Sequence, residues 1–382
     1  MTIKPVSARP PFERISLLLQ GGGALGSYQA GVFEALAEAD LHPDWVAGIS
    51  IGAINSALIV GNAPGQRVEK LRAFWEQVSR PPLGIPYFEK FEIKSDFQHQ
   101  LINQWRSLGT LMWGAPGFFQ PRFPPPLALP AGNPGNLAYY DVGPLKSLLE
   151  QLIDFDRINA KKERFSVGAV NVKTGNFIYF DNQTHRIGPQ HIMASGALPP
   201  GFPAVEVDGE YYWDGGMVSN TPLQWVLDAE PRQDTLAFQV DLWSARGDLP
   251  RDMIEVDVRQ KDIRYSSRTR AGTDQFRQTQ ALRRAAAKLL DAVAPDLRQT
   301  PEAELLAQAA DDKVYNIIHL IYHARKYEGA SKDYEFSRRT MEEHWASGYN
   351  DMMRTLEHPE VLQRPSSPDG VFTFDLAMQG RE

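Results

Sequence analysis

The stretch SLLLQGGGALGSYQAGVFEAL, residues 16–36, passes from an apolar run through three glycines into a helical pattern. Ser16–Leu19 has the length and apolarity of a short buried strand. Beyond the glycines, apolar side chains recur at helical spacing from Ser27 to Glu38. A strand, a glycine loop and a helix in this order begin a parallel α/β fold, because the helix carries the chain back for the next strand.

The next segments predict another strand and helix, and then two hairpins and a further strand. WVAGIS (Trp45–Ser50) predicts a second strand, and GAINSALIVG after it predicts a small buried helix. RFSVGAVNVKTGNFIYFDN predicts a hairpin around residues 173–176, and VEVDGEYYWDGG predicts another with its turn at residues 208–209. TLAFQVDLW (Thr235–Trp243) predicts one more strand. The sequence therefore predicts an α/β fold with a mostly parallel sheet.

Composition divides the chain into two expected parts. Residues 13–244 form the first, interrupted at 80–140 by an excursion rich in proline, glycine and aromatics that is expected to be irregular and lid-like. Residues 245–370 are expected to form a mainly helical extension, with a late strand at KVYNIIHLIYHA and a closing helix that begins at SKDYEF. Between Arg259 and Lys288, nine Lys or Arg residues accompany two Asp residues. This basic stretch indicates a solvated helix face or a site for lipids or partners.

The bulk composition narrows the class of protein. With 382 residues, 42% of them hydrophobic, the chain can bury a sizeable core. A net charge of −7 argues against nucleic-acid binding, and the absence of cysteine excludes disulfides and cysteine nucleophiles. The N-terminal residues lack the apolar core of a signal peptide, and no apolar run approaches the roughly 20 residues of a membrane span. We expect a cytoplasmic protein whose membrane contact, if any, is peripheral.

A candidate nucleophile lies in GISIG, residues 48–52, which matches the pattern G-x-S-x-G around Ser50. The motif follows a predicted strand and opens a predicted helix, which is where a nucleophile elbow lies. Gly48 and Gly52 permit the sharp turn that exposes the serine hydroxyl, and the N-terminus of the helix favours developing negative charge. A plain strand–helix turn with a capping serine is the alternative interpretation.

The glycine loop fits two kinds of anion. Gly21, Gly23 and Gly26 match G-x-G-x-x-G, the pattern of a dinucleotide-binding loop. That function requires an acidic residue at the end of the second strand, but this strand ends in Ile49 and Ser50. Since parallel strands end at the same edge of a sheet, the loop is expected beside Ser50, where its N–H groups can form an oxyanion hole.

The serine also needs a base, and Asp214 is the best candidate. None of the eight histidines occurs in a recognisable catalytic context. Asp214 follows a predicted strand at a Gly-Gly turn, where a carboxylate can face a cleft. Burial would raise its proton affinity and let it accept the serine proton. Two alternatives remain: a turn aspartate without a catalytic role, and a late histidine such as His319 or His323 acting as the base.

The motifs GGGALG, GISIG and DGG, in this order and on this strand–helix layout, resemble those of the patatin-like phospholipases. ASGALPPGFPAV (Ala194–Val205) and the run from Asp214 through Asn220 to Pro222 are similar to later blocks of the family, so the resemblance covers roughly residues 15–240. It implies a three-layer α/β sandwich and a Ser-Asp dyad without histidine. The C-terminal third is similar to an extension of unknown function in a bacterial subgroup.

The resemblance also implies roles for individual residues. The nucleophile would be Ser50, the base Asp214, and the oxyanion hole the backbone of Gly21, Gly22 and Gly23. The glycines that support the turns of these motifs would be Gly26, Gly48, Gly52, Gly215 and Gly216.

We therefore expect a serine acyl-ester hydrolase of lipids that works through an acyl-enzyme, without a cofactor or a metal. Leu25 stands where many relatives carry Arg or Lys, which leaves the head-group preference open. Trp113, Phe118, Phe119 and Phe123 are expected to wall an acyl-chain site, to touch a lipid surface, or to pack under the excursion. A non-enzymatic lipid carrier on the same scaffold is the alternative function. The sequence predicts neither the natural substrate nor the oligomeric state.

Overall fold

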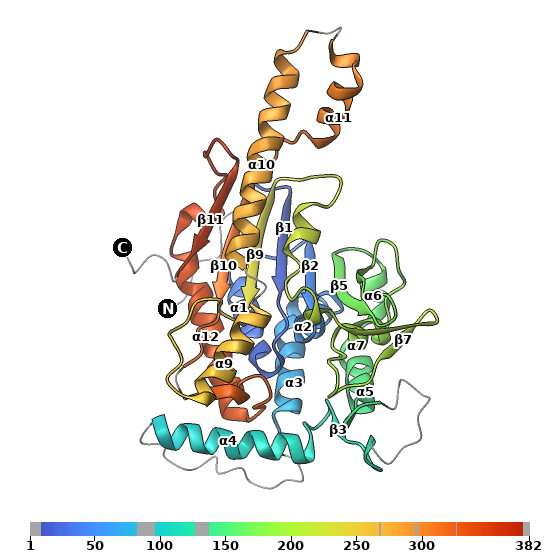
Figure 1. Cartoon of the computed structure of the whole chain (residues 1–382), viewed down its shortest axis with the longest axis vertical. Helices are drawn as coiled ribbons and strands as arrows, with labels where there is room; N and C mark the ends of the chain where they lie inside the picture. Colours follow the sequence, from blue (N-terminus) through green and yellow to red (C-terminus); the bar gives the residue numbers. More distant parts are fainter. Residues whose placement is uncertain are drawn as a thin grey trace.

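A mixed β-sheet forms the centre of the molecule in the computed structural model (Figure 1). The structure describes residues 9–81, 96–126, 137–266, 269–294, 297–325 and 327–376. Within these ranges the sheet has nine strands in the order β11-β10-β9-β1-β2-β5-β8-β7, with β6 paired to β5. The strands are β1 (Arg14–Leu19), β2 (Trp45–Ile49), β5 (Arg164–Asn171), β6 (Phe177–Asp181), β7 (Val205–Val207), β8 (Glu210–Asp214), β9 (Thr235–Asp241), β10 (Tyr315–Ile321) and β11 (Val371–Asp375).

Parallel pairing joins the strands that carry the sequence motifs. β1 pairs in parallel with β2 and with β9, and Leu19 lies opposite Gly48 in this register. The glycine loop after β1 and Ser50 after β2 therefore leave the sheet at the same edge. The two predicted hairpins are present as β5–β6 and β7–β8, which add antiparallel pairs to the sheet. The prediction of an α/β fold with a mostly parallel sheet is confirmed.

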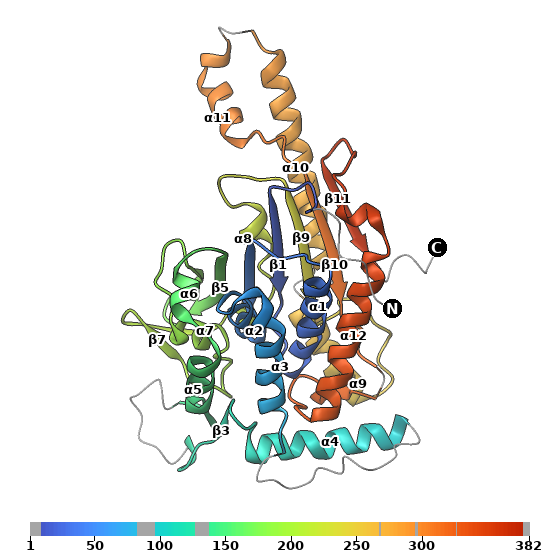
Figure 2. The ribbon, with the colours of Figure 1, turned by 180° about the vertical axis from the view of Figure 1, so that it is seen from behind.

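Helices cover both faces of the sheet, which gives the three expected layers. α1, α2, α3 and α12 lie on the face seen in Figure 2, and α10 crosses the opposite face (Figure 1). Because strand side chains alternate, Leu17 and Leu19 pack into the first layer while Leu18 packs under α8 and α10. The helices are α1 (Ser27–Glu38), α2 (Ile51–Val60), α3 (Arg67–Val78), α4 (Asp96–Trp113), α5 (Gly143–Leu152), α6 (Phe155–Asn159), α7 (Pro189–Ser195), α8 (Leu223–Leu227), α9 (Met253–Tyr265), α10 (Thr269–Ala292), α11 (Pro301–Ala309) and α12 (Arg338–Leu356).

The C-terminal region is part of the same sheet and not an appended unit. β10 pairs with β9 and β11 pairs with β10, so the sheet continues past the expected boundary at residue 244. The helices expected in residues 245–370 are present as α9–α12, but the division into domains 13–244 and 245–370 needs correction. Without β10, the buried strand β9 would have an unpaired edge, which natural proteins avoid. The closing helix begins at Arg338, after its cap Ser337, and not at Ser331.

The excursion at 80–140 contains more regular structure than we predicted. The 18-residue helix α4 lies within it, and β3 (Gln120–Pro121) pairs with β4 (Tyr140–Asp141). The prediction of an irregular segment is wrong here because the prolines that suggested it flank residues 96–113, which contain none. Two segments of the excursion, residues 82–95 and 127–136, lie outside the described residues.

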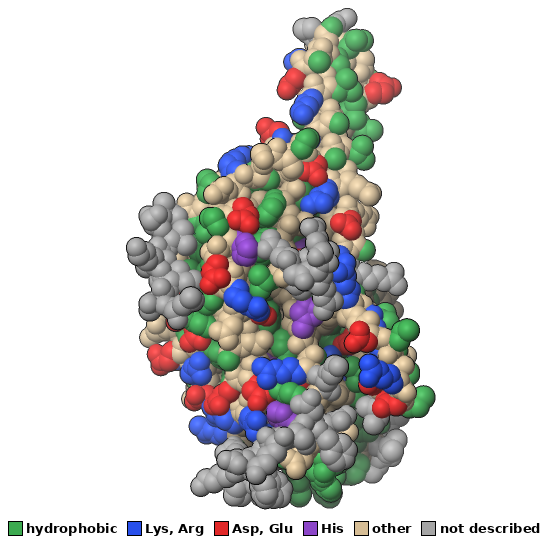
Figure 3. Space-filling view, turned by 90° about the vertical axis from the view of Figure 1, so that its left-hand side faces the viewer, with side chains coloured by type: hydrophobic (Ala, Val, Ile, Leu, Met, Phe, Trp, Pro, Cys, Tyr) green, Lys and Arg blue, Asp and Glu red, His purple; other side chains and the backbone are tan. Residues whose placement is uncertain are grey.

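The basic stretch between Arg259 and Lys288 spans α9 and most of α10, and several of its cations are ion-paired. The pairs are Lys261–Asp333, Arg270–Asp375, Arg277–Asp369 and Arg283–Asp228. Figure 3 likewise shows acidic and basic side chains interspersed over one side of the body. Three of these pairs lie within the C-terminal region and Arg283–Asp228 joins it to the rest of the chain, a structural role that neither of the two expectations foresaw. None of the described helices is long and apolar enough to span a bilayer.

Two glycines let α1 and α12 approach each other closely. A Cβ on Gly31 of α1 would lie 1.9 Å from the carbonyl oxygen of Trp345, and a Cβ on Gly348 of α12 would lie 2.0 Å from that of Tyr28. Backbone atoms cannot move aside as a flexible side chain can. Any larger residue must therefore separate the two helices.

We predict that Gly348→Ala lowers the free energy of unfolding by about 1–3 kcal/mol, the usual cost of overpacking. Gly272→Ala is the matched control, because Gly272 lies within α10 and a Cβ there meets nothing within 4 Å. This control is expected to gain about 0.5–1 kcal/mol. Urea unfolding followed by circular dichroism measures both. Equal effects of the two substitutions would contradict the close packing of α1 on α12.

Candidate active site

Ser50 lies in a sharp turn between β2 and α2. Its φ of 56° and ψ of −122° are strained for a residue with a Cβ. A Cβ on Gly48 would lie 2.2 Å from the carbonyl oxygen of Gly52, and a Cβ on Gly52 would lie 2.2 Å from that of Leu19. The turn itself therefore requires both glycines. This is the geometry expected of a nucleophile elbow.

Asp214 ends β8 and is buried against the hydroxyl of Ser50. Its carboxylate accepts a hydrogen bond of 2.7 Å from the N–H of Gly216. Burial raises the pKa of Asp214 to about 6, although its interactions with the Ser50 hydroxyl and with the N–H of Gly216 oppose the shift. The structure thus brings together the two residues that the sequence placed 164 positions apart (50 and 214).

The peptide of Gly21 lies beside Ser50 and is held on both sides. A Cβ on Gly21 would lie 3.0 Å from the Cβ of Ser50. The N–H of Gly21 donates to Oδ1 of Asn220 at 3.1 Å, and its carbonyl accepts from Nδ2 of Asn220 at 2.9 Å and from Nε1 of Trp243 at 2.8 Å. Because its N–H is engaged, Gly21 offers no free donor to a ligand, in contrast to what we expected.

Gly22 and Gly23 are the loop residues whose N–H groups stay available. In the part of the chain that the structure describes, neither N–H donates to a protein acceptor, whereas Ala24 donates to the carbonyl of Asp333 at 2.8 Å and Leu25 to that of Gly22 at 3.2 Å. Gly23 has a φ of 57°, which favours glycine. The loop therefore presents two consecutive backbone donors next to the serine.

The remaining predicted glycines serve close packing around these elements. A Cβ on Gly26 would lie 2.5 Å from Cγ1 of Ile51, and a Cβ on Gly215 would lie 2.6 Å from the carbonyl oxygen of Gly168. A Cβ on Gly216 would lie 2.8 Å from Oδ1 of Asn220. These contacts press the loop, the elbow and the aspartate turn against one another.

A cavity of about 280 Å³ opens over the serine, and most of its lining is apolar. Besides Ser50, Asp214 and the glycine loop, its walls include Leu111 at the end of α4, Phe118 and Phe119 after it, Leu198–Phe202 after α7, and Asp333, Tyr334 and Phe336 before α12; Ile51 and Ile54 of α2, Tyr140, Asn220, Trp243 and Tyr265 also line it. An apolar cavity with a few polar groups at one end suits a ligand with a long apolar part and a polar reactive group.

The structure separates the expected aromatic residues into two sets. Phe118 and Phe119 line the cavity and pack against Phe336 at centroid distances of 5.7 and 6.2 Å. Trp113 and Phe123 do not line it, and Phe123 is 93% exposed. Of the alternatives expected for these residues, a place in the wall of the cavity applies to Phe118 and Phe119 and not to Trp113 and Phe123.

The histidines lie away from the serine. All eight belong to the described residues, and none of them lines the cavity. His319 is buried on β10, where Nε2 lies 3.3 Å from the hydroxyl of Thr273, and it lines a different cavity together with His323. No histidine is therefore placed to act on Ser50.

Sequence reasoning gave no role to several residues that organise the site. Ser195 accepts from the N–H of Ser50 at 3.0 Å and donates to the carbonyl of Gly168 at 2.7 Å, which fixes the elbow from below. Asn220 and Trp243 hold Gly21, as described above. Ser195 and Asn220 occur in the blocks that resemble the patatin family, so the sequence could have indicated that they belong to the site. No motif in the sequence pointed to Trp243 or Asp333.

Comparison with known proteins identifies the family of the chain. A family model described as patatin-like phospholipase matches residues 17–227, and a second model, described as patatin phospholipase, matches residues 263–368. The chain therefore belongs to the patatin-like phospholipase family, a family of lipid hydrolases. A search of curated proteins found no match.

Two solved structures are similar to the chain at low sequence identity. VipD from Legionella pneumophila is 15% identical, with 99% of this chain and 77% of that one covered and a TM-score of 0.40. ExoU of the type III secretion system of Pseudomonas aeruginosa, solved in complex with SpcU, is 16% identical, with 79% of this chain and 61% of that one covered and a TM-score of 0.26.

The raised pKa of Asp214 predicts a pH-dependent cost in stability. A carboxyl whose pKa is about 6 when folded, against an ordinary value of 3.8 for aspartate, binds its proton more tightly in the folded state. The folded protein therefore loses stability as pH rises from about 4 to 6. Asp214→Asn avoids this loss, so its advantage in free energy of unfolding over wild type should grow by roughly 2–3 kcal/mol between pH 4 and pH 7.

Urea unfolding at several pH values measures that difference. Asp248→Asn, at an exposed position, is the control. A constant difference between Asp214→Asn and wild type from pH 5 to pH 8 would contradict the burial of an ionisable carboxyl at this site.

Proposed function

We propose that the protein is a serine acyl-ester hydrolase of lipids that uses a Ser50–Asp214 dyad. The observation that carries the proposal is that the Ser50 hydroxyl interacts with a buried carboxylate of raised pKa, and that both residues line the same apolar cavity. A pKa of about 6 leaves Asp214 ionised at neutral pH yet a better proton acceptor than an exposed aspartate. Family membership supports the same function.

In this mechanism Ser50 Oγ attacks the ester carbonyl carbon while its proton passes to Asp214. The N–H groups of Gly22 and Gly23 donate to the oxyanion that forms, in place of the three glycines that we first expected. Asp214 then returns the proton to the leaving alcohol oxygen as the carbon–oxygen bond breaks. A water molecule, deprotonated by Asp214, attacks the acyl-enzyme and releases the fatty acid together with free Ser50.

The two alternative functions are less well supported. A Ser-His-Asp esterase requires a histidine beside Ser50, and none lines the cavity. A lipid carrier without activity has no need for a strained serine, free loop donors and a buried base together. We therefore retain the carrier only as an outcome of the next experiment.

We predict that Ser50→Ala and Asp214→Asn each lower kcat/KM for a short-chain nitrophenyl ester by at least about a thousandfold. The double variant should be no worse than either single one, because the two groups act as a unit. His319→Asn is the control and should stay within about twofold of wild type. An inactive wild type that still binds lipid would favour the carrier, and an active Asp214→Asn would show that another group is the base.

We place the contact with aggregated lipid at α4. Its exposed side chains include Leu101, Trp105, Leu108 and Met112, spaced so that they share one side of the helix. His99 and Arg106 of the same helix are buried, so no charge among the described residues 98–113 faces the solvent. Leu111 lines the cavity, which makes this surface continuous with its mouth. An uncharged apolar surface beside the site suits the surface of a bilayer.

We predict that Trp105→Gln with Leu108→Gln weakens sedimentation with phosphatidylcholine vesicles severalfold and leaves hydrolysis of a soluble ester unchanged, because neither residue lines the cavity. The matched control is Leu305→Gln with Leu297→Gln on and before α11, whose residues are 68% and 55% exposed against 66% and 51% for Trp105 and Leu108. Equal loss of vesicle binding in both double variants would mean that α4 is not the lipid contact.

A further inference from the structure

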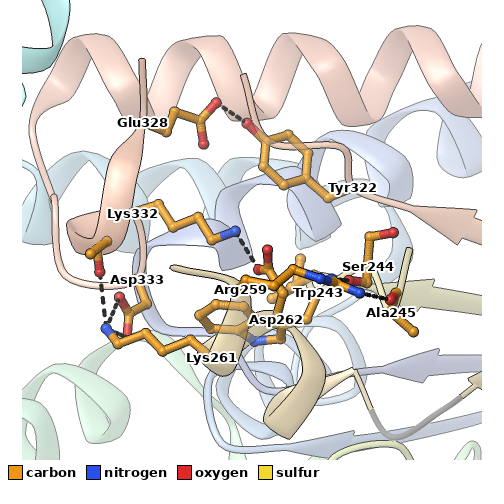
Figure 4. A network of polar contacts seen from close by, with 12 residues as sticks. Trp243, Ser244, Ala245, Arg259, Lys261, Asp262, Tyr322, Glu328, Lys332 and Asp333 are labelled. Atoms are coloured by element: carbon orange, nitrogen blue, oxygen red, sulfur yellow. Dashed lines mark hydrogen bonds and ion pairs between the residues drawn. The ribbon is translucent and has the colours of Figure 1, made fainter. Parts of the chain in front are cut away.

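Two Lys-Asp dipeptides far apart in the chain pair with each other. Lys261 and Asp262 lie on α9, and Lys332 and Asp333 follow the short helix η8 (Gly329–Ser331). Lys261 Nζ lies 2.9 Å from Oδ1 of Asp333, and Lys332 Nζ lies 2.6 Å from Oδ1 of Asp262 (Figure 4). Lys261 also donates to the carbonyl of Ala330 at 3.0 Å. We call these four side chains the ion-pair latch.

The latch holds a segment that touches the glycine loop directly. The carbonyl of Asp333 accepts the N–H of Ala24 at 2.8 Å, and a Cβ on Gly23 would lie only 2.1 Å from the same oxygen. Asp333 also lines the cavity. The backbone of residue 333 is therefore seated against the part of the loop that offers its N–H groups to a ligand.

The same latch supports the other side of the loop through Trp243. Lys332 Nζ lies 5.0 Å from the centre of the Trp243 ring, and the indole N–H holds the carbonyl of Gly21 at 2.8 Å. From α9, Arg259 donates to the carbonyls of Ser244 and Ala245, the residues that follow Trp243 (Figure 4). Residues of α9 and of the segment after η8 thus reach the loop by two separate routes.

The burial of Lys332 explains why this arrangement has to form as a unit. Lys332 is almost completely buried, and a buried charge without a partner strongly destabilises a folded protein. Asp262 supplies that partner only when α9 and the segment after η8 lie side by side. Docking of the C-terminal region and the position of Asp333 are therefore coupled.

We propose that the ion-pair latch positions the glycine loop, so that the C-terminal region sets the geometry of the oxyanion hole. Lys261 is a positioning residue in this scheme, since it acts through the backbone of Asp333 and does not touch the substrate. The catalytic consequence rests on the proposed function, whereas the effect on the loop does not.

The test is hydrogen–deuterium exchange of the full-length chain, comparing wild type with Lys261→Met. We expect backbone amides in peptides covering residues 17–26 to exchange several times faster in Lys261→Met. On a soluble nitrophenyl ester, kcat should fall about tenfold or more while KM changes little, because misplaced donors weaken binding of the transition state and not of the substrate. Asp333→Asn, which keeps the backbone carbonyl and one side-chain acceptor, should show a smaller effect in the same direction.

Lys313→Met is the matched control. Lys313 pairs with Glu13 at 3.0 Å and is 31% exposed, against 32% for Lys261, but it lies two residues before β10 and does not line the cavity. Unchanged exchange in residues 17–26 of Lys261→Met, or the same increase in Lys313→Met, would overturn the proposal. If wild type proves inactive on esters, the proposed function fails, while the exchange experiment still decides whether the latch positions the loop.

Discussion

The rest of the site depends on one constraint, the close packing of the glycine loop against neighbouring segments of the chain. A side chain on Gly21 would collide with Asn220, and one on Gly23 would collide with the backbone of Asp333. Glycine at these positions lets three segments of the chain meet the loop, and each takes up a hydrogen-bonding group that would otherwise be buried without a partner. The N–H groups of Gly22 and Gly23 stay available because no acceptor among the described residues takes them up. Preorganised donors of this kind cost no reorganisation when charge develops.

The same close packing involves the C-terminal region in the site. The family model over residues 17–227 contains the glycine loop, Ser50 and Asp214, whereas Asp333 lies in the C-terminal region that the second model matches. The carbonyl of Asp333 accepts the N–H of Ala24 in the loop, and β10 completes the sheet beside β9. The C-terminal region is therefore as much a part of the site as of the fold.

The sequence predicted the parts of the molecule that are encoded locally. The periodic spacing of apolar residues and the positions of the glycines located the strand–loop–helix units, the turn at Ser50 and the turn after Asp214. Each of these features depends on a few adjacent residues. The sequence did not predict which glycine N–H is free, since the partner of Gly21 is Asn220, which is 199 residues away. The ion-pair latch was not predicted for the same reason. In the sequence Lys261 and Lys332 are typical of surface charges, and only the fold places each of them beside an aspartate. Helix α4 was missed because prolines on both sides obscured a proline-free helical segment.

The proposed mechanism is tested most directly by the covalent chemistry of Ser50. A fluorophosphonate probe reacts with serines whose hydroxyl is activated by a base, and tryptic mass spectrometry identifies the modified peptide. We predict one adduct, on Ser50, that disappears in Ser50→Ala and forms far more slowly in Asp214→Asn. An adduct on another serine, or labelling of Ser50→Ala to the same extent as wild type, would contradict the assignment of Ser50 as the nucleophile.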